Sequence, residues 1–155
     1  MHPMVKDKVV VVTGAGGGIG RDFALAMAAH GAKVVVNDIG ASVAGEGKDA
    51  GPAQKVVEEI KAKGGTAVAN TDSVAEWESA NRIIKCAIDS FQKIDVVVNN
   101  AGILRDRFFF NMSVEEWKAV IDVHLNGTFY VSRAAAPYFK SQNSGRYISM
   151  TSTSG

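Results

Sequence analysis

A glycine-rich turn is the first feature of this sequence that could take part in chemistry. The stretch Thr13–Gly20 contains five glycines and lies after a run of four valines and before an apolar helical pattern. The first N–H groups of a helix are unsatisfied and carry partial positive charge, and glycines let an anion approach the backbone. The turn could therefore hold a pyrophosphate. The alternative is a tight turn that needs positive φ and binds nothing.

The spacing of these glycines differs from that of the common dinucleotide fingerprint. Gly-x-Gly-x-x-Gly is not met, because Ile19 and Arg21 stand where its last glycine would have to be. The pattern that is met is Gly14-x-x-x-Gly18-x-Gly20. It indicates a nucleotide but, by itself, no particular reaction.

An acidic residue, Asp38, closes the second predicted strand, about twenty residues beyond the turn. In a strand–helix–strand unit that position faces the adenosine ribose, where a carboxylate can accept hydrogen bonds from both hydroxyls and would repel a 2′-phosphate. Asp38 therefore favours NAD over NADP. The alternative is that Asn37–Gly40 forms an ordinary turn, since Asn and Asp are common there.

A second acidic residue, Asp72, follows the third predicted strand. Together with Ser73 it lies where it could accept a hydrogen bond from the adenine amino group. The alternative is that the pair begins the next helix, because Ser73 and Glu76 have the spacing of a capping box.

Short β-branched runs alternate with helical patterns and must position these residues. The predicted strands are Val9–Val12, Val34–Asn37, Ala67–Ala69, Ile94–Asn99 and Tyr147–Met150. The predicted helices are Arg21–His30, Ala53–Lys63, one beginning at Ser73 and one running from Ser113 to about Tyr138. This alternation predicts a doubly wound parallel α/β sheet of the Rossmann type, with ligands at the carboxyl ends of its strands. The irregular stretch Ile39–Pro52 is interpreted as a loop beside the cofactor site.

The composition predicts one globular domain. The chain has 155 residues, 46% of them hydrophobic, and a formal net charge of +1. Basic and acidic residues are interspersed, which argues against binding to nucleic acid or an anionic membrane. No apolar stretch approaches the ~20 residues of a membrane span. The single Cys86 excludes an internal disulfide and favours a reducing compartment, so a cytoplasmic location is expected.

Other residues that could bind a ligand or take part in catalysis give weaker indications of a functional site. His2, His30 and His124 have no metal-ligand spacing, so no metal site is predicted. Cys86 lies among isoleucines and is interpreted as a small core residue. The triplet Phe108–Phe110 could cover an acyl chain or join a subunit interface, with core packing as the alternative.

A motif around the fourth predicted strand narrows the sequence pattern to one protein family. Asp95–Gly102 reads Asp-Val-Val-Val-Asn-Asn-Ala-Gly, and it combines with Thr13–Gly20, with Asn126 in Val123–Gly127 and with Gly145-Arg146 ahead of a serine-rich stretch. In this combination the chain resembles the short-chain dehydrogenase/reductase family. Within that family the most similar segments are those of the (3R)-hydroxyacyl-CoA dehydrogenase module of peroxisomal multifunctional enzymes and its bacterial relatives. They are Val34–Gly40, Lys55–Gly65, Ala69–Val74 and Asp95–Arg107.

The resemblance implies roles for individual residues. Those implied to bind the cofactor are Thr13, Gly14, Gly18, Ile19, Gly20, Asp38, Asp72, Ser73, Asn99, Asn100, Ala101 and Gly102. Asn126 would anchor a proton-relay water from a distorted helix turn, with a solvent-facing asparagine as the alternative. Ser152 would orient the substrate oxygen, although Ser149, Thr151 or Ser154 would take that role if the register slipped.

The function that the resemblance implies is an NAD-dependent oxidoreductase that interconverts a secondary alcohol and a ketone, with 3-hydroxyacyl-CoA as the leading substrate class. One alternative is an NADP-dependent 3-oxoacyl-carrier-protein reductase or other carbonyl reductase. Another is a non-catalytic nucleotide-binding fragment, because the Tyr-x-x-x-Lys pair of the family is absent. The chain is therefore expected to be the amino-terminal part of a longer chain, or a truncated copy. A homodimer or homotetramer is expected through the helices from Val74 and Val114 onward.

Overall fold

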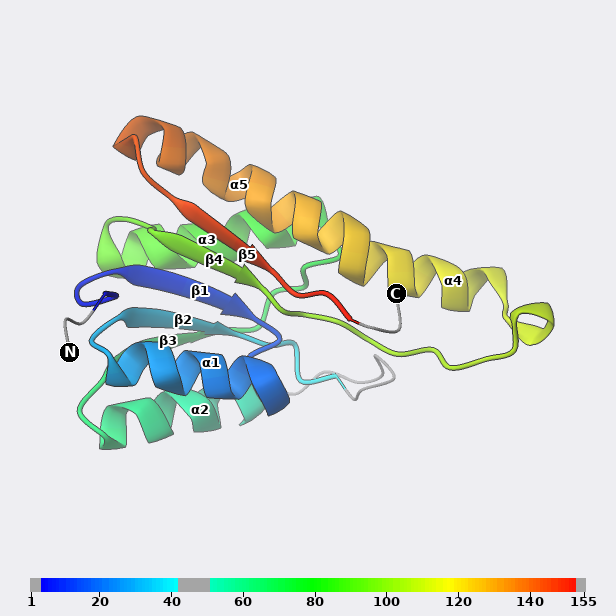
Figure 1. Ribbon diagram of the computed structural model, residues 1–155, viewed down its shortest axis with the longest axis horizontal. Coiled ribbons are helices and arrows are strands. Elements are labelled where there is room, and N and C mark those ends of the chain that lie inside the picture. The colour runs from blue at the N-terminus through cyan, green and yellow to red at the C-terminus, as the bar shows by residue number, and fades with distance from the viewer. Residues whose placement is uncertain (1–3, 42–50, 153–155) are drawn as a thin grey trace.

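Five parallel strands form a single sheet in the computed structural model, which describes residues 4–41 and 51–152 (Figure 1). The strand order is β3-β2-β1-β4-β5, so the order reverses between β1 and β4. The strands are β1 (Val9–Thr13), β2 (Lys33–Asn37), β3 (Thr66–Asn70), β4 (Val96–Asn99) and β5 (Arg146–Ser149). All five predicted strands are confirmed, and the reversal point is where doubly wound sheets bind ligands.

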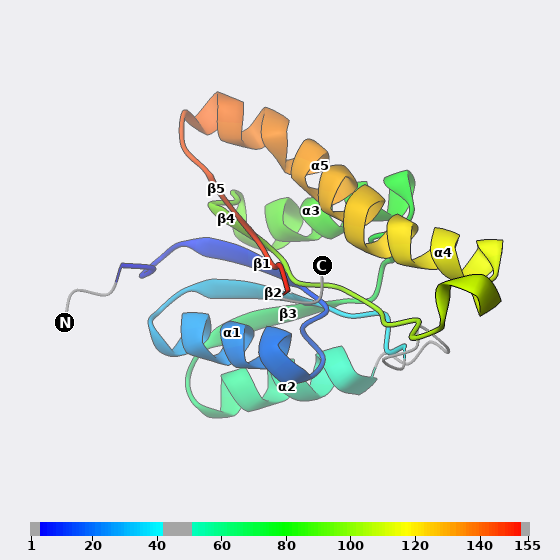
Figure 2. The ribbon, with the colours of Figure 1, turned by 45° about the vertical axis from the view of Figure 1, so that its right-hand side comes forward.

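Helices cover both faces of this sheet. The helices are α1 (Gly18–Ala29), α2 (Gly51–Ala62), α3 (Trp77–Phe91), α4 (Val114–Ile121) and α5 (Gly127–Gln142), with the short turns η1 (Phe109–Asn111) and η2 (Asp122–Asn126). Helices α1 and α2 lie on one face and α3 and α5 on the other (Figures 1 and 2). The valines of β1 alternate between the two cores, Val9 and Val11 toward α3 and α5, Val10 and Val12 toward α1 and α2. This two-sided burial explains why the strands are continuously apolar.

The helix starts show one correct and one wrong prediction. The capping box at Ser113 is confirmed, since its Oγ accepts from the Glu116 N–H at 3.1 Å and Glu116 accepts from the Ser113 N–H at 2.9 Å. The capping box at Ser73 is wrong. Helix α3 begins at Trp77, and Ser73 Oγ instead accepts from the N–H of Ala75 at 3.1 Å. Burial of Val74 in the core beside α3 and α5 holds this segment in a turn and delays the helix.

The predicted long helix runs from Val114 to Gln142, four residues beyond Tyr138, and contains Pro137 in its last part. Its turn Asp122–Asn126 has π-helical geometry, so the distortion expected at Asn126 is confirmed. Asn126 is half-buried, and its amide donates to Asp122 Oδ1 at 2.8 Å. Single π turns inside α-helices are frequent at functional sites.

The segment after β4 and helix α4 extend beyond the sheet as an arm (Figures 1 and 2). At its tip Phe108, Phe109 and Phe110 are 75%, 88% and 82% exposed, and the rings of Phe108 and Phe110 stack 5.6 Å apart. The core-packing alternative for this triplet is therefore wrong in this chain.

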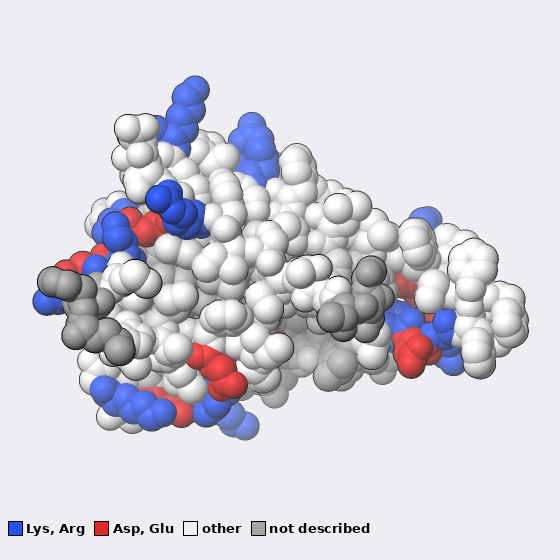
Figure 3. Space-filling model, viewed as in Figure 1, with Lys and Arg blue, Asp and Glu red and all other residues white. Residues whose placement is uncertain are grey.

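Two further expectations concern the surface and the single thiol. On the face seen in Figure 3, charged side chains lie mainly toward the edges and both signs occur side by side, with no continuous basic stripe. None of the helices in the described ranges is long and apolar enough to cross a membrane. Cys86 is half-buried against the core beside α3 and α5, and burial raises the pKa of its thiol, in keeping with the predicted packing role.

Candidate cofactor site

The glycine turn joins β1 to α1 at the reversal point of the sheet. Gly14 and Gly18 have φ values of 62° and 50°, a left-handed conformation that glycine adopts without the steric cost of a Cβ. Gly20 is required for a different reason, because a Cβ there would lie 2.2 Å from the carbonyl oxygen of Gly14. The turn is thus folded tightly against its own helix. Among the described residues no side chain caps the first turn of α1, so an anion could take that place.

Asp38, at the end of β2, is bound directly to this turn. Its Oδ2 accepts a hydrogen bond from the N–H of Gly16 at 2.8 Å, and its Oδ1 accepts from the N–H of Gly40 at 2.7 Å. The bond to Gly40 closes the ordinary local turn that was considered as the alternative for Asn37–Gly40. Asp38 therefore forms this local turn and also contacts the glycine turn. A Cβ on Gly16 would lie 2.8 Å from Asp38 Cγ, so glycine is needed for this contact.

Thr13 and Asn100 link the ends of the two central strands. The Thr13 hydroxyl accepts from the N–H groups of Asn100 and Ala101, at 3.1 and 3.0 Å. The Asn100 amide donates back to the carbonyls of Thr13 and Gly14, at 3.0 and 3.1 Å. Thr13 is 1% exposed, so its side chain holds the site together from beneath.

Asn99 lies in β4 and is also buried. Its amide nitrogen donates to the hydroxyl of Ser132 on α5 at 3.0 Å. Its amide oxygen has no hydrogen-bond partner within the described part of the chain. Asn99 therefore connects the central strand to α5 rather than facing the cavity described next.

An open cavity of about 440 Å³ lies at the carboxyl ends of these strands. Its lining includes eight of the residues predicted to bind the cofactor, namely Gly14, Gly18, Asp38, Asp72, Ser73, Asn100, Ala101 and Gly102. Four other predicted residues are not part of this lining. Thr13, Gly20 and Asn99 support it from within the fold, and Ile19 is 62% exposed on α1.

Several lining residues were missed by the sequence reasoning. They are Gly16, Gly17, Asn37, Val74, Ile103 and Val123. Ile39, Ala41 and Pro52 also line the cavity, and they belong to the segment Ile39–Pro52 that was predicted to lie beside the cofactor site. The apolar members could form walls for flat ring systems, but isolated apolar residues in loops give no recognisable pattern in a sequence. Gly16 and Gly17 were visible within the glycine cluster, yet only the contact with Asp38 shows what Gly16 does.

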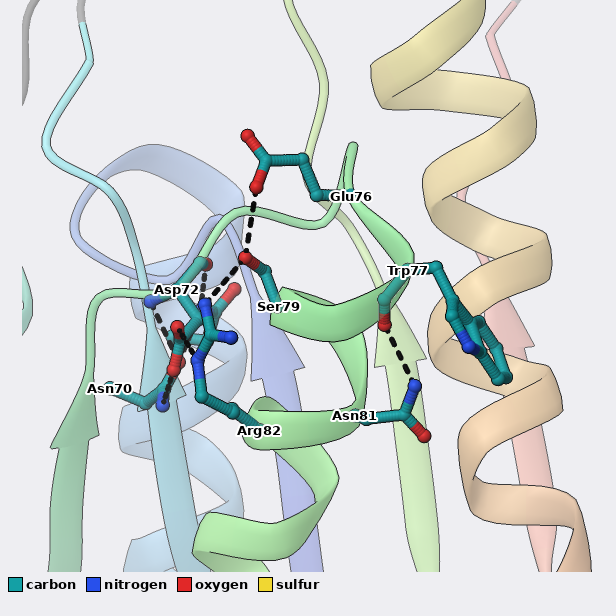
Figure 4. A network of polar contacts seen from close by, with 8 residues as sticks. Asn70, Asp72, Glu76, Trp77, Ser79, Asn81 and Arg82 are labelled. Carbon is teal, nitrogen blue, oxygen red and sulfur yellow. Dashed lines mark hydrogen bonds and ion pairs between the residues drawn. The ribbon is translucent and has the colours of Figure 1, made fainter.

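Asp72 lies in a polar network at one side of the cavity (Figure 4). Its Oδ1 accepts from Arg82 Nε at 2.6 Å, and its Oδ2 accepts from the Asn70 amide at 2.9 Å. Helix α3, which carries Arg82, begins at Trp77, so Asp72 is not a helix cap. The helix-entry alternative for Asp72 is therefore wrong, and Asp72 is one of the residues that line the cavity.

The residues predicted for catalysis lie beyond this lining. Asn126 belongs to the π turn, which reaches the cavity through Val123. The neighbouring His124 places Nε2 3.0 Å from the N–H and 2.9 Å from the carbonyl oxygen of Ile103, so it ties the π turn to the cavity rim. Ser152 is exposed and follows β5, as does Thr151, whereas Ser149 is the last residue of that strand. The alternative Ser154 lies outside the described residues.

These residues suit a dinucleotide. The glycine positions leave room for an anion at the start of α1, a carboxylate stands at the end of β2, and apolar side chains line the rest of the cavity. In the described ranges, no group of three or more His, Cys, Asp or Glu side chains is arranged to hold a metal ion. The fold and site together define a nucleotide-binding α/β protein.

The chain belongs to the short-chain dehydrogenase family, whose model, described as short chain dehydrogenase, matches residues 8–155. It is 55% identical to a short-chain type dehydrogenase/reductase of Mycobacterium tuberculosis over 153 residues, 99% of this chain and 54% of that protein. It is also 55% identical to the mouse peroxisomal multifunctional enzyme type 2 over 148 residues, 96% of this chain and 20% of that protein. The predicted resemblance is confirmed.

A solved structure supports the same assignment. A 7α-hydroxysteroid dehydrogenase complexed with NADH and 7-oxo glycochenodeoxycholic acid superposes with a TM-score of 0.87 at 30% identity, covering 97% of this chain and 55% of that one. The expected Rossmann architecture is therefore confirmed. The chain spans about half the length of the bacterial relative and of this structure.

Proposed function

We propose that the protein containing this chain is an NAD-dependent oxidoreductase that interconverts a secondary alcohol and a ketone. The bound nicotinamide would accept or donate the hydride. The observation that carries the proposal is the position of Asp38, which lines the cavity and contacts the glycine turn through Gly16. In that arrangement Asp38 would accept hydrogen bonds from the ribose, beside a turn that would bind the pyrophosphate.

The carboxylate of Asp38 also supports the preference for NAD. It would accept hydrogen bonds from the ribose hydroxyls, whereas the 2′-phosphate of NADP would meet a like charge. Two unit charges ~4 Å apart repel by up to ~4 kcal/mol at an effective dielectric constant of 20. This upper bound corresponds to nearly three decades in affinity, since ~1.4 kcal/mol is tenfold.

The remaining roles follow from the family resemblance. Gly14, Gly18 and the start of α1 would receive the pyrophosphate. Asp72 and Ser73 would bind the adenine, with Asp72 accepting from its amino group. Asn126 would hold a relay water at the π turn, and Ser152 would donate a hydrogen bond to the substrate oxygen and stabilise charge there.

The proposed substrate class is a 3-hydroxyacyl thioester of coenzyme A. Support comes from the 55% identity to a peroxisomal multifunctional enzyme and from the segments that resemble its dehydrogenase module. The exposed triplet Phe108–Phe110 offers apolar surface either to an acyl chain or to a second subunit of a homodimer or homotetramer. A cytoplasmic location stays a prediction.

The test uses the protein that contains this chain, purified and titrated with NADH and NADPH, then assayed with NAD or NADP and a (3R)-hydroxyacyl-CoA. We expect tighter binding of NADH and reduction of NAD that depends on the thioester. Turnover with NADP alone would instead favour a carrier-protein or other carbonyl reductase. Binding without turnover on hydroxyacyl thioesters, simple alcohols and steroids would favour a non-catalytic role, and failure to bind either dinucleotide would overturn the proposal.

A further inference from the structure

Arg82, on α3, makes polar contacts behind one wall of the cavity without lining it. Its Nε donates to Asp72 Oδ1 at 2.6 Å, and its terminal nitrogen donates to the Ser79 hydroxyl at 2.7 Å (Figure 4). Ser79 in turn donates to Glu76 at 3.2 Å. The guanidinium is thus held on two sides and oriented toward Asp72.

The opposite side of Asp72 is held by two asparagines. Asn70, at the end of β3, donates to Asp72 Oδ2 at 2.9 Å and accepts from the Asp72 N–H at 3.0 Å. Asn37 is 2% exposed, and its amide donates to Asn70 Oδ1 and to the Asp72 carbonyl, both at 2.8 Å. Since Asn37 directly precedes Asp38, the network joins the backbone that carries both acidic residues of the cavity.

We infer that Arg82 is a positioning residue that fixes the carboxylate of Asp72 as an acceptor for the adenine amino group. The inference rests on the proposed function, in which the cavity binds NAD. An ionised carboxylate has about four lone-pair sites, and the two side-chain donors to Asp72 occupy one on each oxygen. Acceptor capacity therefore remains for a ligand, on a carboxylate whose rotation is already restricted.

This role differs from a contribution to folding. The side chain of Arg82 is 56% exposed and that of Asp72 22% exposed, and ion pairs near the surface contribute little to stability. Loss of the guanidinium would leave the carboxylate of Asp72 held by the Asn70 amide alone and free to rotate. The expected consequence is a weaker and less selective contact with adenine in a folded protein.

The test compares NAD with nicotinamide hypoxanthine dinucleotide, in which a carbonyl oxygen replaces the adenine amino group. Binding of both to the protein that contains this chain is measured by calorimetry. We expect the unmodified protein to prefer NAD by about tenfold, as for one hydrogen bond to a charged group. In Arg82→Met that preference should fall to about twofold or less, mostly through weaker binding of NAD.

Two further variants make the outcome decisive. Lys85→Met removes a 2.5 Å ion pair with Asp89 on the same helix and should leave the preference unchanged. Arg82→Lys keeps the charge but loses the fork that reaches both Asp72 and Ser79, so an intermediate preference is expected, and it serves as the test if Arg82→Met does not fold. An undiminished preference in both Arg82 variants, or equal losses for the two dinucleotides, would overturn the inference. Absence of binding of either dinucleotide to the unmodified protein would overturn the proposed function itself.

Discussion

The carboxylate of Asp38 accepts a hydrogen bond from the backbone N–H of Gly16 at 2.8 Å, across a separation of 22 residues. One side chain therefore joins the glycine turn to the residue that follows β2, at the lining of the cavity. The contact exists because β1 and β2 are paired in parallel, with Thr13 opposite Asn37, so the turn after one strand meets the residue after the other.

Replacement of Asp38 by asparagine should shift cofactor preference. The amide keeps the size of the side chain but removes the negative charge that disfavours a 2′-phosphate. We expect the ratio of NADPH to NADH affinity to rise at least about tenfold, measured by fluorescence titration of each dinucleotide. Glu58→Gln, an exposed change on α2, is the control, and an unchanged ratio in Asp38→Asn would contradict the assignment of Asp38.

Alanine at Gly20 should destabilise the fold, whereas alanine at Gly17 should not. The new Cβ at Gly20 would lie 2.2 Å from the Gly14 carbonyl oxygen and 2.4 Å from the Asn100 amide, but at Gly17 it would meet nothing within 4 Å. Overpacking of this kind costs about 1–3 kcal/mol. Urea unfolding measures both, and equal stability of the two variants would show that the turn is looser than described.

The hydroxyl of Thr13 should stabilise the junction of β1 and β4. Thr13→Val keeps the shape but leaves the Ala101 N–H without its acceptor, whereas the Asn100 N–H keeps its bond to the Val98 carbonyl at 3.1 Å. Unsatisfied buried donors cost about 1–3 kcal/mol, so the free energy of unfolding should fall by that amount. Thr13→Ser, which retains the oxygen, should lose less, and a smaller loss in Thr13→Val than in Thr13→Ser would contradict the role of the hydroxyl.

Asp95 should make stability depend on pH in the acid range. Burial acts to raise the pKa of this carboxyl, but the hydrogen bonds from the Val9 N–H and Lys93, with the charges of Lys93 and Lys8, outweigh it and lower the pKa below the ordinary 3.8. The folded state thus binds its proton less readily than the unfolded chain.

The stabilisation from Asp95 is therefore complete above the ordinary pKa of 3.8 and is lost as pH falls through the lower folded value. Asp95→Asn should be less stable than the unmodified protein near neutral pH, and the difference should shrink below pH 3.8. Unfolding by urea across that range measures the difference. A gap that widens in acid would contradict the sign of this shift.

Much of the fold could be predicted because it depends on short stretches of sequence. Runs such as Val9–Val12 predict buried strands, the glycines after them predict a turn, and Ser113 with Glu116 predicts a helix start. The mistake at Ser73 has the same origin. The sequence shows the capping preference of Ser73, but it does not show that Val74 is buried against α5. This tertiary contact outweighs the capping preference.

By itself, the sequence determined the alternating strands and helices, the glycine turn, the family and the acidic residue at the end of β2. Only the tertiary structure decided that Asp38 bonds to Gly16, that Arg82 orients Asp72 and that Thr13 supports the cavity from below. The physical reason is the strand order, which brings β2 and β4 to either side of β1. Contacts between residues as far apart as Thr13 and Asn100 arise from that order. The periodicity of a few neighbouring residues does not predict the strand order.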